Sequence, residues 1–414
     1  MLHFKTLTFF FLLAFPFVTL CQVSALFEPK PVIEPLEYSK DIFFRSLPDT
    51  VAESSGLIFW DGLLWTHNDG GNLAAIYGID TATGNIRKTL LVKGAKNFDW
   101  EDITQDAGYI YVGDFGNNSG AYRELAIYKI HKGSITGDKE EVFVRAEKIA
   151  FKYADHDGSK KKSYQHNFDC EAFFEFDKQL YIFTKNWADQ KTRLYSMPTK
   201  LDMYHISPIA TFDVGGLITG ADISRSGERV ALIGYVDFMP FVWLFWDFEG
   251  DDFFGGKKIK IDFPDLAFVQ TEAITFTTEN ELFISCEASA EPQSLFKVDF
   301  SELIKAGKGD NESAPQQLIV PGEVEKISKK ELNVQFDVRT NADVLVEIYN
   351  SRWELLDEKT YKKGSSNSPA VIFNSKGFRD GIYFLKFILQ NDADEGNDKD
   401  SQKNVVIHKI EIGK

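Results

Sequence analysis

The chain has 414 residues, and its 62 Asp and Glu residues outnumber its 46 Lys and Arg residues, so the formal net charge is −16. A strongly acidic chain repels nucleic acids and anionic membrane surfaces, and we therefore exclude both as partners. The excess of acidic residues favours solubility or the binding of cations.

The N-terminus has the pattern of a secretory signal peptide. Lys5 precedes the apolar run LTFFFLLAFPFVTL, and small residues follow at Val23-Ser24-Ala25. This order predicts a signal peptide at 1–25, cleaved near Ala25, and an N-terminal extension at 26–40. Cys21 follows Leu20 rather than a small residue, so lipidation is the less favoured alternative. We expect no membrane span in the mature chain.

Five segments then share a five-residue pattern. They are ESSGL at 53–57, DWEDI at 99–103, DCEAF at 169–173, TGADI at 219–223 and QTEAI at 270–274. Their middle residues, Ser55, Glu101, Glu171, Ala221 and Glu272, lie 46, 70, 50 and 51 positions apart. A period near 50 residues predicts one supersecondary unit repeated around an axis, as in a β-propeller.

Each repeat also has a β-rich run and, further along, an aliphatic–aromatic pair. The pairs are Ile76-Tyr77, Ile127-Tyr128, Leu194-Tyr195, Leu244-Phe245 and Leu295-Phe296. Runs rich in β-branched and aromatic residues between Gly, Asn and Asp are typical of strands, so each repeat predicts a four-stranded blade. The strand at 41–47 should complete the last blade and close the ring at 41–302.

The number of blades depends on the 70-residue interval. Five blades is the favoured count, with a polar insertion at 152–167 accounting for the extra length. Six blades is the alternative.

A polar linker at 303–320 separates the propeller from a second module. The strands predicted in this module at 321–414 are ELNVQFDV, ADVLVEIYN, LLDEKTY, AVIFN, GIYFLKFIL and NVVIHKIEI. Their spacing predicts a small antiparallel β-sandwich. The acidic stretch at 392–402 should be a solvated hairpin loop.

The repeated pattern predicts an acidic mouth at one end of the propeller channel. Equivalent positions in rotationally repeated blades lie at equivalent radii, so acids far apart in sequence should meet there. The residues expected at this mouth are Asn68, Asp69, Asp99, Asp114, Asn117, Asn118, Asp169, Lys185, Asp222, Glu272 and Glu287. Some of these Asp and Asn residues could instead only shape turns.

Hard cations such as Ca²⁺ take six to eight oxygen ligands, which a ring of carboxylates supplies. The candidate calcium ligands are Asp99, Glu101, Asp114, Glu171 and Glu272. His67 and His166 are better explained as loop or core residues than as ligands. Cys170 and Cys286 fit two free buried thiols better than a disulfide, and no zinc-binding or nucleophile-elbow motif occurs.

Two resemblances add to this. VEIYN at 346–350, DGIYFLK at 380–386 and KNVVIHKI at 403–410 resemble the C-terminal sorting domain of the Bacteroidota type IX secretion system. ESSGL at 53–57 followed by DWEDI at 99–103 is similar to the paired openings of SdiA-regulated and phytase-like esterase propellers. The first resemblance implies export by the type IX machinery to the cell surface or the medium. The second implies a propeller over about 40–310 and, in some relatives, calcium-assisted phosphate-ester chemistry.

Two functions fit these observations. The favoured one is a ligand-binding module that takes a glycan, a peptide or another partner at the acidic mouth, with or without calcium. The alternative is a calcium-assisted hydrolase of phosphate esters or lactones, in which the metal polarises the substrate and Glu101 or Glu171 acts as the base. No nucleophile–base pair is apparent, so binding is preferred.

Overall fold

The computed structural model describes residues 36–38, 42–137, 139–289, 292–301, 303, 319–328, 331–338, 342–350, 355–363, 369–376, 378–379, 381–390 and 405–412. The predicted signal peptide, most of the predicted linker and the acidic loop at 392–402 lie outside these residues. Among the residues described, no helix is long and apolar enough to cross a membrane.

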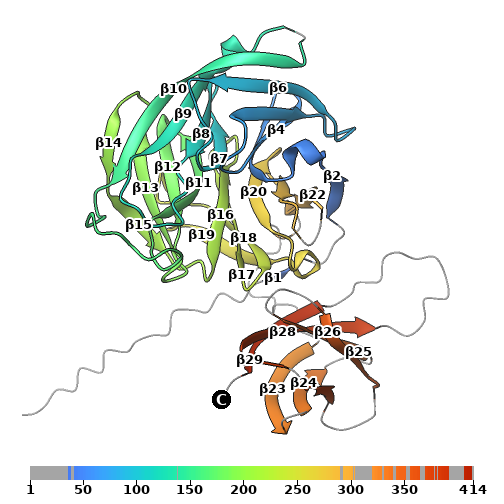
Figure 1. Cartoon of the computed structure of the whole chain (residues 1–414). Helices are drawn as coiled ribbons and strands as arrows, with labels where there is room; N and C mark the ends of the chain where they lie inside the picture. Colours follow the sequence, from blue (N-terminus) through green and yellow to red (C-terminus); the bar gives the residue numbers. More distant parts are fainter. Residues whose placement is uncertain are drawn as a thin grey trace, which may run out of the picture. The chain divides into compact units, whose positions relative to one another are not determined.

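Within the described residues, five four-stranded blades surround one axis (Figure 1). From the innermost strand outward, the first blade is β3 (Ser54–Trp60), β4 (Leu63–Asn68), β5 (Ala75–Ile79) and β6 (Ile86–Lys93), and the second is β7 (Trp100–Gln105), β8 (Tyr109–Asp114), β9 (Leu125–His131) and β10 (Glu141–Tyr153). The third blade is β11 (Asp169–Phe176), β12 (Gln179–Lys185), β13 (Thr192–Pro198) and β15 (Pro208–Phe212), and the fourth is β16 (Leu217–Ile223), β17 (Arg229–Val236), β18 (Met239–Trp246) and β19 (Lys257–Asp262). The fifth blade is β20 (Thr271–Phe276), β21 (Glu281–Cys286), β22 (Ser294–Asp299) and β2 (Phe43–Ser46).

The N-terminal strand closes the ring, as predicted. β2 pairs antiparallel with β22, with Phe43 opposite Phe296 and Ser46 opposite Ser294. The fifth blade therefore combines strands from both ends of the propeller sequence. Two short strands extend the blades at their outer edges: β1 (Leu36–Glu37) pairs with β19, and β14 (Met203–Ile206) pairs with β10.

The long interval between the second and third repeats is an insertion and not a sixth blade. β10 runs for 13 residues and pairs with both β9 and β6. The loop at 154–168 then leads to β11. The long outer strand and this loop together account for the extra length.

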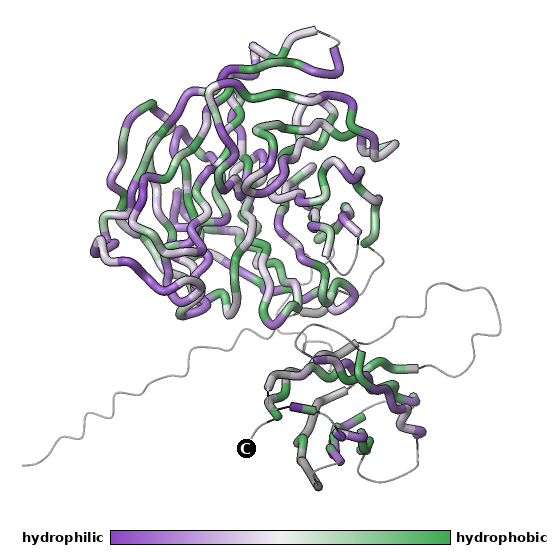
Figure 2. The backbone as a smooth tube through the Cα atoms, in the orientation of Figure 1, coloured by the Kyte–Doolittle hydropathy of each residue, from purple (hydrophilic) through white to green (hydrophobic). Residues whose placement is uncertain are grey.

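The aliphatic–aromatic pairs join neighbouring blades. On each third strand the aliphatic residue packs toward the next blade and the aromatic residue toward the previous one, because successive side chains of a strand point to opposite faces. Ile76 thus belongs to the core between the first two blades, whereas Tyr77 belongs to the core between the fifth and the first. Such apolar layers between all five neighbouring pairs hold the ring together. Figure 2 shows hydrophobic stretches alternating with hydrophilic ones along the propeller chain.

The C-terminal module is a sandwich of two antiparallel sheets. The sheets are β23 (Ile319–Ser328), β24 (Glu331–Val338) and β27 (Ala370–Asn374), and β26 (Leu355–Tyr361), β25 (Asp343–Asn350), β28 (Gly381–Gln390) and β29 (Val405–Ile412). Side chains of both sheets, among them Val334, Val346 and Phe387, form one buried core. The six predicted strands are present. β23 was not predicted, because Pro321 and Gly322 made its sequence resemble linker.

Candidate functional site

Every blade has a β-bulge, and in four of the five blades it coincides with the middle residue of the repeated pattern. Between the first and second strands of each blade the pairing shifts by one residue, for example between Trp100 and Asp102. The bulged residues are Ser55, Glu101, Glu171, Thr219 and Glu272. A bulge re-aims a side chain and is common beside functional sites. The glutamates of the pattern therefore hold equivalent positions at one end of the innermost strands.

In the fourth blade the bulged residue is Thr219, two residues before the predicted marker Ala221. The prediction that Asp222 faces the acidic mouth is consequently wrong. Asp222 lies further along β16, where its Oδ2 accepts hydrogen bonds from the Thr275 hydroxyl at 2.9 Å and the Phe276 amide at 2.8 Å. It belongs to the cavity at the opposite end of the innermost strands.

The second strands supply the rest of the mouth. Asn68 pairs with Ser54 and Asp114 with Trp100, just before the bulge. Both side chains hold the backbone: Asn68 Oδ1 accepts from the Glu53 amide at 3.2 Å, and Asp114 Oδ1 accepts from the Asp99 amide at 2.9 Å. The residue after this position is Asp69 in the first blade. Its counterparts in the later blades are Phe115, Lys185, Tyr235 and Glu287. The side chain that holds the turn and the side chain at the mouth thus belong to consecutive residues, as Asn68 and Asp69 do.

Three carboxylates meet closely. Asp69, Asp99 and Glu101 each place a carboxylate oxygen so that the three atoms lie within 4.8 Å of one another. Burial raises the pKa of Asp69 to about 6. Burial also raises the pKa of Asp99, although Arg123, at 3.3 Å from its carboxylate, acts in the opposite direction.

Glu101 is the most enclosed of the three, with 4% of its surface exposed. Burial, and then the charge of Glu171, raise its pKa well above the usual value. Among the described residues, none donates a hydrogen bond to its carboxylate. A Cβ atom on Gly116 would lie 1.8 Å from Glu101 Oε1, so the carboxylate fits against the backbone only because residue 116 is glycine. Within the described part of the chain, Glu101 is thus a buried acid without a hydrogen-bond donor.

A buried ion pair faces this trio from the third blade. Lys185 Nζ lies 3.3 Å from Glu171 Oε2, and both side chains are almost completely buried. The ammonium group also lies 5.1 Å from the ring centre of Trp187 and 5.6 Å from that of Tyr235, a cation–π arrangement. Burial alone would lower the pKa of Lys185, but Glu171, Tyr235 and Glu272 raise it well above its usual value. Lys185 therefore stays charged.

The fifth blade adds two more acids. Burial raises the pKa of Glu272, while Lys185 opposes this shift. Burial and then Glu272 raise the pKa of Glu287 to about 9, and Glu287 Oε2 accepts from Gln270 Nε2 at 2.6 Å. We call the acids that gather here the acidic funnel: Asp69, Asp99, Glu101, Glu171, Glu272 and Glu287.

Other predicted mouth residues shape loops. Asp169 Oδ1 accepts from the Asn117 amide at 2.6 Å, and its Oδ2 accepts from Trp187 Nε1 at 2.7 Å. The Asn117 side chain bonds the backbone of residues 121 and 168. Asn118 is half-buried, and its carbonyl lies 3.1 Å from His166 Nε2. Of the five predicted calcium ligands, only Asp99 and Glu101 belong to the trio, whose third member is Asp69. The other three predicted ligands, Asp114, Glu171 and Glu272, lie outside it.

The histidines and cysteines behave as predicted. His67 is fully buried, its Nδ1 lies 3.0 Å from the Asn68 carbonyl, and burial lowers its pKa to about 4. His166 Nδ1 accepts from the Phe168 amide at 3.1 Å. Cys170 and Cys286 are free and buried.

Exposed apolar side chains stand on the loops at the same end of the blades. Leu73 follows β4, Phe98 precedes β7, Tyr122 follows β8 and Tyr164 lies in the loop before β11; their exposed fractions are 64%, 65%, 43% and 57%. The Tyr164 ring packs edge-on against Trp187, with 5.0 Å between ring centres. Sequence reasoning missed this rim and Trp187, because aromatic residues in loops carry no pattern that separates binding from packing.

No family model matches the chain, and no curated protein is significantly similar to it in sequence. Solved structures that resemble it include an exo-β-1,3-galactanase from Phanerochaete chrysosporium bound to galactose, at 10% identity and a TM-score of 0.43, covering 90% of this chain and 93% of that one. They also include a putative 6-phosphogluconolactonase from Bacteroides uniformis, at 12% identity and a TM-score of 0.33, covering 78% and 89%. A quinoprotein alcohol dehydrogenase-like protein from Bacteroides thetaiotaomicron has 11% identity and a TM-score of 0.30, covering 79% and 69%.

Proposed function

We propose that this chain is an exported ligand-binding β-propeller whose acidic funnel holds a divalent cation such as Ca²⁺ at Asp69, Asp99 and Glu101. The observation that carries the proposal is the convergence of three carboxylate oxygens within 4.8 Å, one of them from buried Glu101, to which no described residue donates a hydrogen bond. Ca²⁺ prefers carboxylate oxygens and completes its shell with water or ligand oxygens.

The ligand class follows from what surrounds the cation. An oxygen-rich ligand can complete the coordination of the metal and accept a hydrogen bond from Lys185. The exposed ring of Tyr122 or Phe98 can pack against its apolar faces. A glycan combines hydroxyl oxygens with apolar ring faces, so a glycan is the class that this arrangement favours over a peptide. Export through the type IX machinery, which the C-terminal resemblance implies, remains part of the proposal.

Thermal unfolding with and without calcium tests the cation. For a Kd of about 0.1–1 mM, as in extracellular calcium modules, about 10 mM Ca²⁺ stabilises the folded state by about 1.4–2.7 kcal/mol. The Tm of the propeller should rise by about 3–10 °C. Asp69→Asn combined with Glu101→Gln should abolish the rise. Asp213→Asn, which changes an exposed acid elsewhere, should leave it intact. A Tm that responds neither to calcium nor to chelator contradicts the proposal.

The ligand class needs a separate measurement. The full chain applied to a glycan array should bind in calcium and lose binding in chelator. Binding that persists in chelator would contradict a role for the metal in glycan recognition. It would still support glycan recognition by the propeller.

A calcium-assisted hydrolase of phosphate esters or lactones is the second candidate, and one observation favours it. Burial, and then the charge of Glu272, raise the pKa of Glu287 to about 9 in the funnel without a bound metal, so there this residue is protonated at neutral pH and can donate a proton to a leaving group. Glu171 is less suited to act as a base, since Lys185 lies against it. Calcium-dependent turnover of a generic phosphate ester or lactone that is lost in Glu287→Gln would support this candidate over pure binding.

A further inference from the structure

Arg123 lies against the trio of carboxylates, on the loop between β8 and β9. Its Nη2 lies 3.3 Å from Asp99 Oδ2, and the same nitrogen donates a hydrogen bond to the Gly116 carbonyl. A Cβ atom on Gly116 would lie 1.8 Å from Glu101 Oε1 and 2.8 Å from Asp99 Oδ2, so these two carboxylate oxygens lie on the same side of the trio. The guanidinium group therefore contacts the Asp99 oxygen that faces Glu101.

The backbone positions Asp99 without help from Arg123. The Asp99 amide donates to Asp114 Oδ1 at 2.9 Å, and the Asp99 carbonyl accepts from the Gly116 amide at 3.2 Å. The carboxylate also fits between two glycines, because a Cβ atom on Gly70 or on Gly116 would lie 2.8 Å from one of its oxygens. Loss of the guanidinium group should therefore change the charge beside Asp99 more than the place of its carboxylate.

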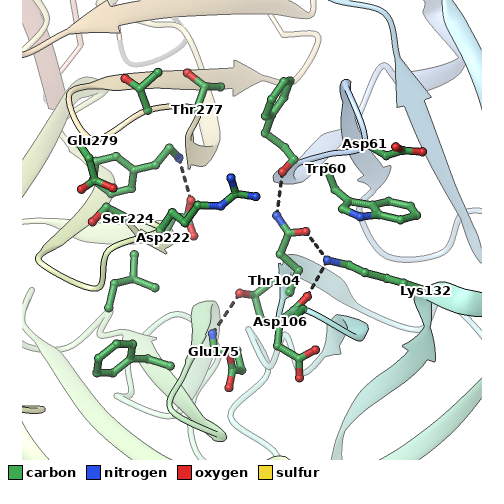
Figure 3. A pocket seen from close by; sticks show the side chains of 18 of the residues that line it. Trp60, Asp61, Thr104, Asp106, Lys132, Glu175, Asp222, Ser224, Thr277 and Glu279 are labelled. Atoms are coloured by element: carbon green, nitrogen blue, oxygen red, sulfur yellow. Dashed lines mark hydrogen bonds between the residues drawn. The ribbon is translucent and has the colours of Figure 1, made fainter.

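The two buried lysines of the propeller are held elsewhere. Lys185 pairs with Glu171 at 3.3 Å on the third blade. Lys132 lies at the opposite end of the innermost strands, where its Nζ donates to the Asp106 carbonyl at 2.6 Å (Figure 3). Among the residues that the structure describes, Arg123 is the cation in direct contact with a carboxylate of the trio.

This contact determines the charge that a bound cation would meet. With Arg123 in place, the trio has a formal charge of −2 (three carboxylates against one guanidinium group). One divalent cation balances that charge. The guanidinium group repels any cation bound to the trio, and the repulsion grows with the charge of the cation, because the Coulomb energy is proportional to the product of the two charges.

We propose that Arg123 sets the affinity and the charge selectivity of the cation site at Asp69, Asp99 and Glu101. It weakens the binding of every cation, and it weakens trivalent cations more than divalent ones. The arginine thus selects a divalent cation through charge rather than through the geometry of the ligands. This role rests on the function proposed above, because it concerns the same cation site.

Calorimetric titration of the full chain with Ca²⁺ tests the role of Arg123. Arg123→Gln should bind Ca²⁺ more tightly than the wild type by a factor of about ten or more, because a positive charge beside the site is lost. Arg123→Lys keeps that charge and should bind within about threefold of the wild type. The matched control is Arg193→Gln. Arg193 lies 3.0 Å from Asp155 and is partly exposed, as Arg123 is, and its loss should leave the Kd for Ca²⁺ unchanged.

The trivalent ion Tb³⁺ separates an effect of charge from a displacement of the ligands. Its repulsion by the guanidinium group is one and a half times that of Ca²⁺, so a gain of about tenfold for Ca²⁺ in Arg123→Gln predicts a gain of about thirtyfold for Tb³⁺. A carboxylate that had merely moved would not produce this ratio.

The outcomes separate the role of Arg123 from the calcium site itself. If the wild type binds Ca²⁺ and Arg123→Gln binds it no more tightly, the role of Arg123 is overturned and the calcium site stands. If only Arg123→Gln binds Ca²⁺, the proposed function of the wild type is overturned, whereas the opposition of Arg123 to cations is supported. Absence of binding by both overturns both. Arg123→Met should behave as Arg123→Gln does, and the Tm of each variant in chelator shows that it is folded.

Discussion

Replacement of Lys185 by methionine should destabilise the propeller more than the loss of any surface ion pair. The change removes the ammonium group and keeps a long apolar stem. Glu171 Oε2, 3.3 Å from that ammonium in the intact protein, then lies buried beside Glu272 and Glu101 with no cation against it. Removal of one partner of a buried ion pair costs about 3–5 kcal/mol, because the remaining charge is uncompensated.

That cost corresponds to a fall in Tm of about 6–20 °C for a domain of this size. Glu171→Gln in the same chain should restore most of the loss, since no charge is then left unpaired. The matched control is Lys297→Met. Lys297 lies 2.7 Å from Glu281, but both side chains are partly exposed, so its loss should cost at most about 1 kcal/mol.

The cost should also depend on pH, with a definite sign. Burial raises the pKa of Glu171 well above its usual value and Lys185 opposes this shift, so removal of Lys185 raises that pKa further. Between the two pKa values the variant binds a proton that the wild type does not, so its deficit grows as the pH rises and shrinks as the pH falls. Thermal unfolding in chelator at about pH 5 and about pH 8 measures this. A deficit no larger than that of Lys297→Met, or one that is equal at both pH values, would refute the reasoning.

Three further changes test other parts of the structure. Gly116→Ala should displace Glu101 and reduce the calcium-induced rise in Tm, whereas Gly108→Ala, whose Cβ would lie 3.7 Å from its nearest neighbour, should not. Thr104→Val removes the hydroxyl that accepts from the Glu175 amide at 3.1 Å, and should lower the stability by about 1 kcal/mol in chemical denaturation, because a partly buried amide loses its acceptor. Deletion of 319–414 should leave the unfolding transition of the propeller intact but block export in a host with the type IX machinery; normal export of the shortened chain would contradict the sorting-domain assignment.

The fold was predictable because its signals are local. The alternation of Ile76 and Tyr77 toward opposite faces, repeated in each blade, requires only the two-residue period of a strand. The strand that closes the ring was predictable because it precedes the first repeat in the place where a fourth strand precedes each later one. The missed strand β23 marks the limit of this reasoning, since Pro321 and Gly322 within it are typical of linkers.

The acidic mouth was only partly predictable, because it depends on register. A shift of one residue reverses the direction of a side chain, so Asn68 and Asp69 have different roles although they are neighbours. The predicted marker residue coincides with the bulge in the first, second, third and fifth blades. In the fourth blade the alignment was wrong, because the bulge lies at Thr219 and the Gly-Ala-Asp run that follows it resembles the repeated pattern. The sequence contains no signal that fixes a bulge to one residue, and the pairing partner across the blade decides it.

The acidic funnel and the opposite end of the innermost strands differ in how their carboxylates are satisfied, and this difference carries the functional argument. At the opposite end, Asp106, Asp222 and Glu279 accept hydrogen bonds from backbone amides and hydroxyl groups. At the acidic funnel the cations that the described residues bring to the six carboxylates are Arg123 and Lys185, which leaves a formal charge of −4 (two cations against six anions). Because these carboxylates are buried, the remaining negative charge among the described residues is reduced by protonation. The raised pKa values of Asp69 and Glu287 reflect this. A divalent cation neutralises the same charge without requiring protonation. Glu101, to whose carboxylate none of the described residues donates a hydrogen bond, belongs to the trio where such a cation would bind.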